Sequence, residues 1–179
     1  MNILLLTADA ARTSIALVIA RGETSCALEG EVVVLDGAAQ VQLGEPRGQV
    51  LHQVEVPTPA VLVAAMQAGI GEVLSWLAAR NIRVDLVAHR IAHHAENDHI
   101  VRLAPDRVAT LAEFDASKAA VYGIEAVASA SPAVPQVAFF AVRPHSPVTI
   151  AQAIAAAGLH APAGCQKKLK VRCESCCAS

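Results

Sequence analysis

The order in which apolar runs follow one another constrains the fold of this chain more than any other feature of its sequence. Five short runs, most of them rich in Val, Leu and Ile, come before the first helical pattern. Runs of this length and composition predict strands. The predicted strands, in meander order, are Asn2–Thr7, Ser14–Ala20, Glu29–Asp36, Ala38–Gly44 and Gln49–Val56.

A helical pattern follows the fifth predicted strand. Thr58 can cap this helix, Pro59 suits its first position, and apolar residues recur at helical spacing as far as Leu77. Gly69 and Gly71 weaken the helix but do not exclude it.

Strands and helices alternate in the rest of the chain. The predicted elements are the strand Val84–Ala92, helices over 104–114 and 116–131, the strand Pro135–Val142 and a helix over 146–159 that ends at Gly158. An antiparallel meander that leads into right-handed crossovers is the element order of the ribonuclease H-like fold, which actin and the sugar kinases share. We therefore predict an α/β lobe with helices packed on a mixed sheet. The alternative, a flavodoxin-like sheet, would need a helix between the first two strands.

Composition restricts the classes of function that suit the chain. Hydrophobic residues form 54% of the sequence and aromatic residues 3%, which favours a core of small branched side chains between a sheet and its helices. The net charge of −2 gives no reason to expect nucleic acid or a membrane surface as a partner. No apolar stretch is long enough to cross a membrane, and Asp9 and Arg12 interrupt the N-terminal run that a signal peptide would need. We expect a cytoplasmic protein.

Four segments of the chain resemble the acetate kinase family. The opening MNILLLTADAARTSIALV resembles the family's first strand, turn and second strand, and VAHRIAHHAE resembles its GHRVVHGGE motif. LAEFDASKAAVYGIEA stands where the family has LAPLHNPxNLxGIEA, and VPQVAFFAVRPH resembles xPQVAVFDTAFH. The four segments lie in family order, between Met1 and His145. They predict that residues 1–160 form an acetate kinase-like N-terminal lobe.

The resemblance implies phosphoryl transfer between ATP and a short-chain carboxylate such as acetate or propionate, with magnesium. Such catalysis depends on positioning and on the neutralisation of charge. By this resemblance, Arg90 would hold the carboxylate or the migrating phosphoryl group. Ala92 and Phe114 stand where apolar residues line the family's acetate pocket. Thr7 and Ser14 stand in the turn whose polar side chains touch phosphates and metal.

Other positions that carry the family's chemistry are changed. The histidine of the LHNP segment falls on Asp115, and the aspartate that helps to hold magnesium falls on Ala141, which has no ligand atom. A glycine pair becomes His94 and Ala95, which adds side chains where backbone should approach closely. The histidine that ends the last motif is kept as His145.

The family has two similar lobes, and most of its ATP site lies in the second. We expect this chain to be a truncated, degenerate member that lacks the second lobe and is inactive alone, since half a cleft cannot clamp a nucleotide or exclude water. Activity would need a second chain that supplies the other lobe. A small carboxylate or phosphate ligand and a second copy of the chain are further candidate partners. The alternative is a non-catalytic α/β binding module, so whether the chain is an enzyme stays open.

Residues 161–179 differ in composition from the rest, because they are basic, aperiodic and rich in cysteine. They predict an irregular tail. Cys165, Cys173, Cys176 and Cys177 could together offer four thiolates to a zinc ion, and the middle two have C-x2-C spacing. The adjacent Cys176 and Cys177 point apart in an extended chain, however, so a tail with free thiols is the simpler interpretation.

The histidines near Arg90 suggest a second metal hypothesis. His89 and His93 would share one face of a strand, but no carboxylate or cysteine clearly converges on them. A solvated loop, with His89 packed beside the sheet, is the simpler interpretation. Arg90 itself has an alternative role as a partner of Glu96 or Asp98.

Asp9 and Asp36 raise the question of a nuclease. The acidic metal cluster of a ribonuclease H-like nuclease needs an aspartate within the first strand, and we predict that Asp9 lies in the turn after it. The negative net charge and the scarcity of aromatic residues also argue against nucleic acid.

Overall fold

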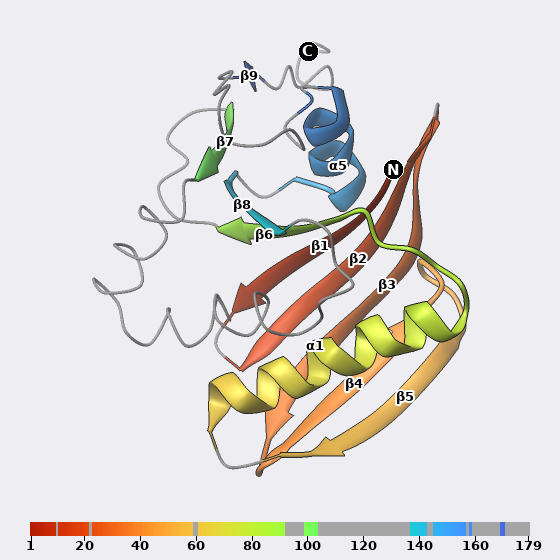
Figure 1. Cartoon of the computed structure of the whole chain (residues 1–179), viewed down its shortest axis with the longest axis vertical. Coiled ribbons are helices and arrows are strands. Elements are labelled where there is room, and N and C mark those ends of the chain that lie inside the picture. The colour runs from red at the N-terminus through yellow and green to blue at the C-terminus, as the bar shows by residue number, and fades with distance from the viewer. Residues whose placement is uncertain are drawn as a thin grey trace, which may run out of the picture.

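The chain forms a mixed sheet with a helix on each face (Figure 1). A computed structural model describes residues 1–9, 11–21, 23–58, 61–91, 99–103, 137–142, 145–156, 158 and 169–170. Within these residues the strand order across the sheet is β5-β4-β3-β2-β1-β6-β8-β7-β9.

The first five strands form the predicted antiparallel meander. They are β1 (Asn2–Asp9), β2 (Arg12–Arg21), β3 (Glu23–Leu35), β4 (Ala38–Gly44) and β5 (Val50–Pro57), and each pairs with the next. Asp36 and Gly37, with φ of 48° and 78°, form the tight turn between β3 and β4, a conformation that glycine and aspartate tolerate. Because β1 and β2 pair directly as a hairpin, the flavodoxin-like alternative is wrong.

Three details of the first five strands and of the helix after them differ from the prediction. Strand β3 begins at Glu23, six residues before the predicted Glu29. Asp9 is the last residue of β1 and not part of the turn, because β1 and β2 stay paired as far as Asp9 and Arg12. Thr58 does not cap the helix: its Oγ1 donates to the carbonyl oxygen of Gly37 at 3.2 Å. Helix α1 (Leu62–Ala79) begins after Val61 and has no side-chain cap.

After α1 the chain returns to the middle of the sheet. Strand β6 (Leu86–Ile91) lies parallel to β1, and β8 (Val137–Ala141) lies parallel to β6. These two parallel pairings are the crossover part of the predicted order. Strand β7 (His99–Leu103), which we did not predict, pairs antiparallel with β8. The short β9 (Leu169–Lys170) pairs with β7.

Helix α5 (Pro147–Ala156) confirms the predicted last helix. Its N-terminus is capped by Ser146, whose Oγ accepts a hydrogen bond from the backbone N–H of Thr149 at 3.2 Å. Gly158 follows with a φ of 61°, the left-handed conformation that commonly ends a helix. The predicted helices over 104–114 and 116–131 and most of the predicted tail lie outside the described residues, and the boundary at residue 160 stays a prediction. No described helix combines the length and the apolarity that a membrane span requires.

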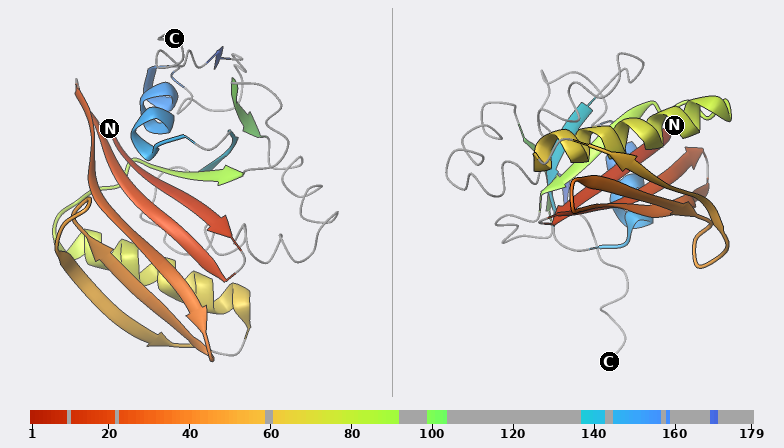
Figure 2. Two further views of the ribbon diagram at one scale, coloured as in Figure 1. Left: turned by 180° about the vertical axis from the view of Figure 1, so that it is seen from behind. Right: turned by 90° about the horizontal axis from the view of Figure 1, so that it is seen from below.

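The two helices cover opposite faces of the sheet (Figures 1 and 2). Side chains alternate between the faces along each strand, so β1 sends Leu4 and Leu6 to the α1 face and Ile3 and Leu5 to the α5 face. Helix α1 lies across β3, β4 and β5, whereas α5 lies over β1, β2 and β3. Beyond α5, the same face of β4 and β5 has no helix over it among the described residues.

Candidate functional site

One row of residues crosses the sheet on the α5 face, and it contains three of the predicted site residues. Thr7 of β1 is the register partner of Ser14 on β2 and of Arg90 on β6. Arg90 is in turn the partner of Phe140 on β8, which is the partner of Arg102 on β7. Register partners point to the same face of a sheet, about 5 Å apart. The fold therefore brings Ser14, Thr7 and Arg90 together near the carboxyl ends of the parallel strands.

Arg90 supplies a cation next to Thr7 in this row. Its side chain is half-buried, and burial lowers the pKa of Arg90 from its ordinary value. Guanidinium stays charged in proteins, so this position keeps a cation. Its Nε donates to the backbone oxygen of Val142 at 3.5 Å, a long hydrogen bond. The remaining N–H groups suit the two oxygens of a carboxylate or phosphate.

A small hollow lies on the α5 face of the sheet, beside Thr7 and Ser14. Thr7 and Ser14 line it together with Glu29 and with Pro147 at the first turn of α5, and its volume is about 240 Å³. The hydroxyls of Thr7 and Ser14 can donate hydrogen bonds to an anion. The first turn of α5 contributes the partial positive charge of a helix N-terminus. The hollow can therefore hold a few polar atoms of an anion, although Glu29 opposes its charge.

The residue before Arg90 belongs to the other face of the sheet. His89 is 1% exposed, its ring stacks on Phe139 with centroids 5.5 Å apart, and neither ring nitrogen has a hydrogen-bond partner. Burial lowers the pKa of His89 to about 4, so the ring is neutral near neutral pH. The expectation that His89 packs beside the sheet is confirmed. Among the described residues, no three His, Cys, Asp or Glu side chains could hold a metal ion together.

Several predicted site residues lie outside the part of the chain that the structure describes. These are Ala92, Phe114, Asp115 and the four tail cysteines Cys165, Cys173, Cys176 and Cys177, together with His93, Glu96 and Asp98. Ala141 is described and is the last residue of β8. Its methyl group offers nothing to a metal at the strand end where the resemblance implies an aspartate, so the described residues do not fit the family's magnesium. His145 is half-buried, just before α5.

Phe140 and Arg102 belong to the same row but were not predicted as candidate site residues. The position of Arg102 follows from strand β7, which was not predicted. The only local signal of this strand is the short alternation of apolar and polar residues in HIVRL. The row also continues in the other direction, beyond Ser14, through residues that were not predicted. Ser14 pairs with Glu31 on β3, Glu31 pairs with Gln42 on β4, and Gln42 pairs with Gln53 on β5. Glu31 forms an ion pair with Arg12 at 3.3 Å.

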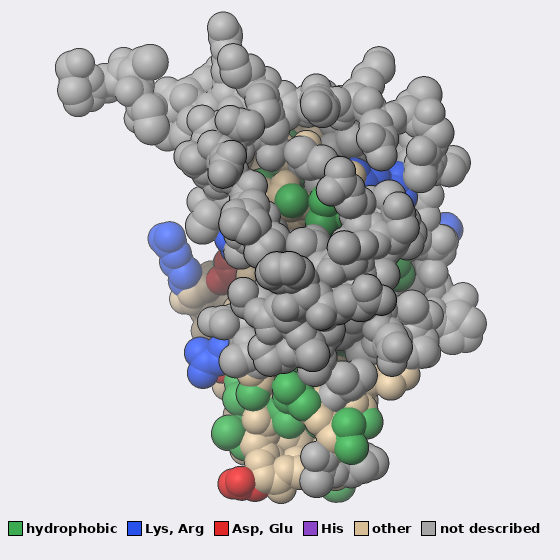
Figure 3. All heavy atoms as spheres, turned by 90° about the vertical axis from the view of Figure 1, so that its left-hand side faces the viewer, with side chains coloured by type: hydrophobic (Ala, Val, Ile, Leu, Met, Phe, Trp, Pro, Cys, Tyr) green, Lys and Arg blue, Asp and Glu red, His purple; other side chains and the backbone are tan. Residues whose placement is uncertain are grey.

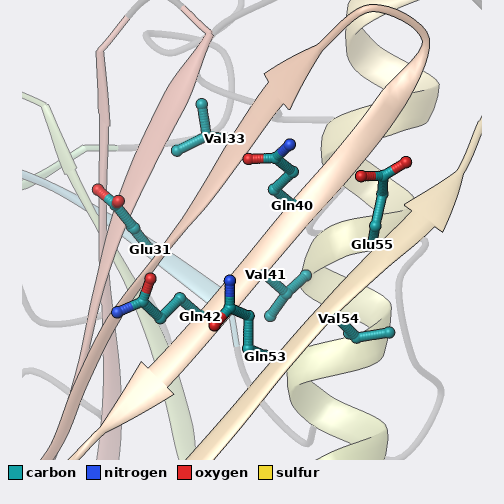
Figure 4. Close-up of a pocket in the computed structure, with 8 residues that line it drawn as sticks. All are labelled: Glu31, Val33, Gln40, Val41, Gln42, Gln53, Val54 and Glu55. Atoms are coloured by element: carbon teal, nitrogen blue, oxygen red, sulfur yellow. The ribbon is translucent and has the colours of Figure 1, made fainter. Parts of the chain in front are cut away.

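A second hollow lies on the uncovered face of β3, β4 and β5, and it is lined by Glu31, Gln42 and Gln53 (Figure 4). It has a volume of about 240 Å³, and the side chains that rise from this face are mostly polar, including Gln40, Gln53 and Glu55. Val41 and Val54 point the other way, towards α1. The polar alternation of β4 and β5 is typical of a solvated sheet face.

The strand order and the helix on each face define the fold class: it is a ribonuclease H-like α/β lobe with a mixed sheet. No known protein-family signature matches the sequence, and no curated protein matches it. Solved structures do match. An acetate kinase from Porphyromonas gingivalis superposes with a TM-score of 0.58 at 18% identity over 79% of this chain.

Two further kinases show the same likeness. A propionate kinase from Francisella tularensis gives a TM-score of 0.57 at 14% identity over 79% of this chain, and an acetate kinase from Entamoeba histolytica gives 0.51 at 13% over 78%. The predicted resemblance is thus confirmed for the fold, and fold similarity at these identities does not establish activity. The chain spans 37%, 36% and 34% of the lengths of these three proteins.

Proposed function

We propose that this acetate kinase-like lobe binds a small carboxylate or phosphate anion at the end of β6 and does not transfer phosphoryl groups by itself. The observation that carries the proposal is the row Ser14–Thr7–Arg90, in which two hydroxyls and a half-buried guanidinium share one face at the carboxyl ends of parallel strands. Ligands of open α/β sheets bind outside this end of the strands.

Each part of the row has a role in anion binding. Arg90 would hold two oxygens of the anion through its guanidinium N–H groups. Thr7 and Ser14 would donate hydrogen bonds from their hydroxyls to a third oxygen, near the first turn of α5. Acetate, propionate and acetyl phosphate are the natural ligands to test, because the similar solved structures are named acetate and propionate kinases.

The absence of transfer by this chain alone is part of the proposal. Phosphoryl transfer needs metal and donor groups that neutralise charge on the migrating group. The position that would supply a metal ligand at the end of β8 is Ala141. We infer that ATP and magnesium, if the protein uses them, require further groups from a second lobe. We place the protein in the cytoplasm, as its sequence predicts.

Thermal denaturation with and without ligand tests the binding. A ligand that binds only the folded state raises the midpoint, so we expect acetate, propionate or acetyl phosphate to stabilise the protein and Arg90→Gln to abolish the effect. Arg47→Gln is the matched control, because Arg47 lies in the exposed turn between β4 and β5. Equal ligand shifts in the wild type and in Arg90→Gln would show that the anion binds elsewhere.

A further inference from the structure

One edge strand of the sheet has no outer neighbour within the part of the chain that the structure describes. β5 is the first strand in the sheet order, and it pairs only with β4 among the described residues. Figures 1 and 2 show it as the outermost ribbon of the meander, with α1 packed on one face of the sheet. An eight-residue strand is about 27 Å long, and its outward N–H and C=O groups are a template for another strand.

This edge lacks the features that normally prevent strand pairing. Proteins protect edge strands with lysines, interior prolines or inward-pointing charges. β5 has no lysine or arginine, its one carboxylate is Glu55, and its proline is the terminal Pro57. The irregularity in its pairing with β4 is confined to the start of the strand, opposite Leu43 and Gly44. From His52 onward β5 is a regular strand.

Exposed apolar side chains gather at the two ends of the same edge. Within the described residues the exposed large hydrophobic side chains are Leu35, Val50, Leu51 and Val61, between 43% and 59% exposed. Val50 and Leu51 begin β5. Leu35, at the end of β3, is two strands from the end of β5, because Ala38 of β4 pairs with both Leu35 and Pro57. Val61 follows only four residues after Pro57.

The space-filling view shows one of these two ends. In Figure 3, hydrophobic side chains gather at the lower end of the molecule, where the β3–β4 turn and the start of α1 lie. The middle of the edge is polar by contrast, with Gln53 and Glu55 on the open face (Figure 4). The edge is thus apolar at both ends and polar between them.

We propose that a second copy of this chain pairs antiparallel with β5 and extends the sheet across a two-fold dimer. In an antiparallel pair the start of one strand lies beside the end of the other. Val50 and Leu51 of one copy would therefore meet the Pro57 end of β5 of the second copy, at both ends of the interface. A two-fold interface needs this kind of self-complementary surface.

The charges of the edge are compatible with this pairing. If Gln53 lies opposite its own copy, Glu55 lies opposite Leu51 of the second copy. If Val54 lies opposite its own copy, Glu55 lies opposite Gln53. Neither register places like charges opposite each other, which would destabilise the pair. His52 stays on the other face, where its Nε2 contacts Glu72 of α1 at 3.0 Å.

Sedimentation velocity over a wide concentration range tests the dimer. We expect the wild type to dimerise and the double variant Leu51→Lys, Gln53→Lys to weaken the dimer by about tenfold or more, because lysines on an edge strand oppose pairing. The double variant Gln40→Lys, Gln42→Lys is the matched control, since it adds the same charges on the same face one strand further in. The control should dimerise like the wild type.

Hydrogen exchange of the wild type gives a second measurement that needs no variant. The outward amides of β5 should become protected as the protein concentration rises, while the exposed turn at Glu45–Gly48 should not change. A wild type that stays monomeric, or a β5 whose exchange does not depend on concentration, would overturn the proposal. A dimer that survives the edge lysines unchanged would place the interface on another surface.

Discussion

His89 and Arg90 are neighbours in β6 and have opposite environments. Because strand side chains alternate between the faces, His89 is sealed against Phe139 on the α1 face while Arg90 reaches the α5 face near Thr7. The two neighbouring residues therefore differ in role: His89 packs in the core, whereas Arg90 lies in the row that we propose binds an anion. A strand assignment predicts this alternation, but only the structure shows that His89 lacks a hydrogen-bond partner.

The buried His89 makes the stability of the protein depend on pH. Burial lowers the pKa of His89 from 6.5 to about 4. Between these pH values the unfolded chain takes up a proton and the folded chain does not, so stability falls as the pH falls from 6.5 towards 4. The loss should approach roughly 3 kcal/mol and then level off.

Urea unfolding at several pH values tests this contribution. His89→Leu removes the titrating ring and keeps an apolar side chain of similar size, so its stability should change less between neutral pH and the lower limit. The difference between wild type and variant isolates His89 from other groups. A wild type and a variant that lose equal stability on acidification would assign the pH dependence to other residues.

At the scale of elements, the close approach of α1 to the sheet depends on one glycine. A Cβ on Gly69 would lie 2.4 Å from Cγ1 of Val32 and 3.2 Å from Cβ of Ala39, both in the core. A Cβ on Gly71, two residues later, would meet nothing within 4 Å. From the sequence, both glycines only weaken the helix. The packing shows that Gly69 is needed for the close contact between α1 and the sheet, whereas Gly71 is not.

Alanine at these two glycines should therefore have opposite effects. Gly69→Ala overpacks the interface, at a cost of about 1–3 kcal/mol, which outweighs the gain in helix propensity. Gly71→Ala should stabilise the protein by up to about 1 kcal/mol, because alanine favours the helix and meets no neighbour. Urea midpoints of the two variants check this, and equal stabilisation by both would show that α1 lies further from β3 than the structure has it.

The elements were predictable where the signal is local. The meander, α1, β6, β8 and α5 each have an apolar run or a cap within their own residues, so the sequence located most of their ends to within a few positions. The exception is β3, whose first six residues, from Glu23, were not predicted as strand. Thr58 shows where this fails: a good capping residue bonds to Gly37, which lies 21 residues earlier in the chain. β7 was missed because five residues carry little pattern, and its pairing with β8 joins segments far apart in sequence.

At the scale of the whole molecule, the fold follows from the order of the elements, whereas the row Ser14–Thr7–Arg90, where we propose that an anion binds, follows from the register of the strands. The element order predicted the ribonuclease H-like lobe, and the likeness to acetate and propionate kinases confirms it. That Thr7, Ser14 and Arg90 share one row could not be read from the sequence, because register depends on pairing between strands. Ala141, at the end of β8, has no ligand atom where the predicted resemblance implies an aspartate.

Phosphorus NMR of acetyl phosphate mixed with ADP, magnesium and the protein tests the central claim most directly, because it reports binding and transfer together. We expect the acetyl phosphate resonance to broaden with the wild type and with Arg47→Gln, and to stay sharp with Arg90→Gln. No resonances of ATP should appear with any of the three. Acetyl phosphate that stays sharp with the wild type would contradict the binding site, and the appearance of ATP would contradict the claim that this chain alone does not transfer phosphoryl groups.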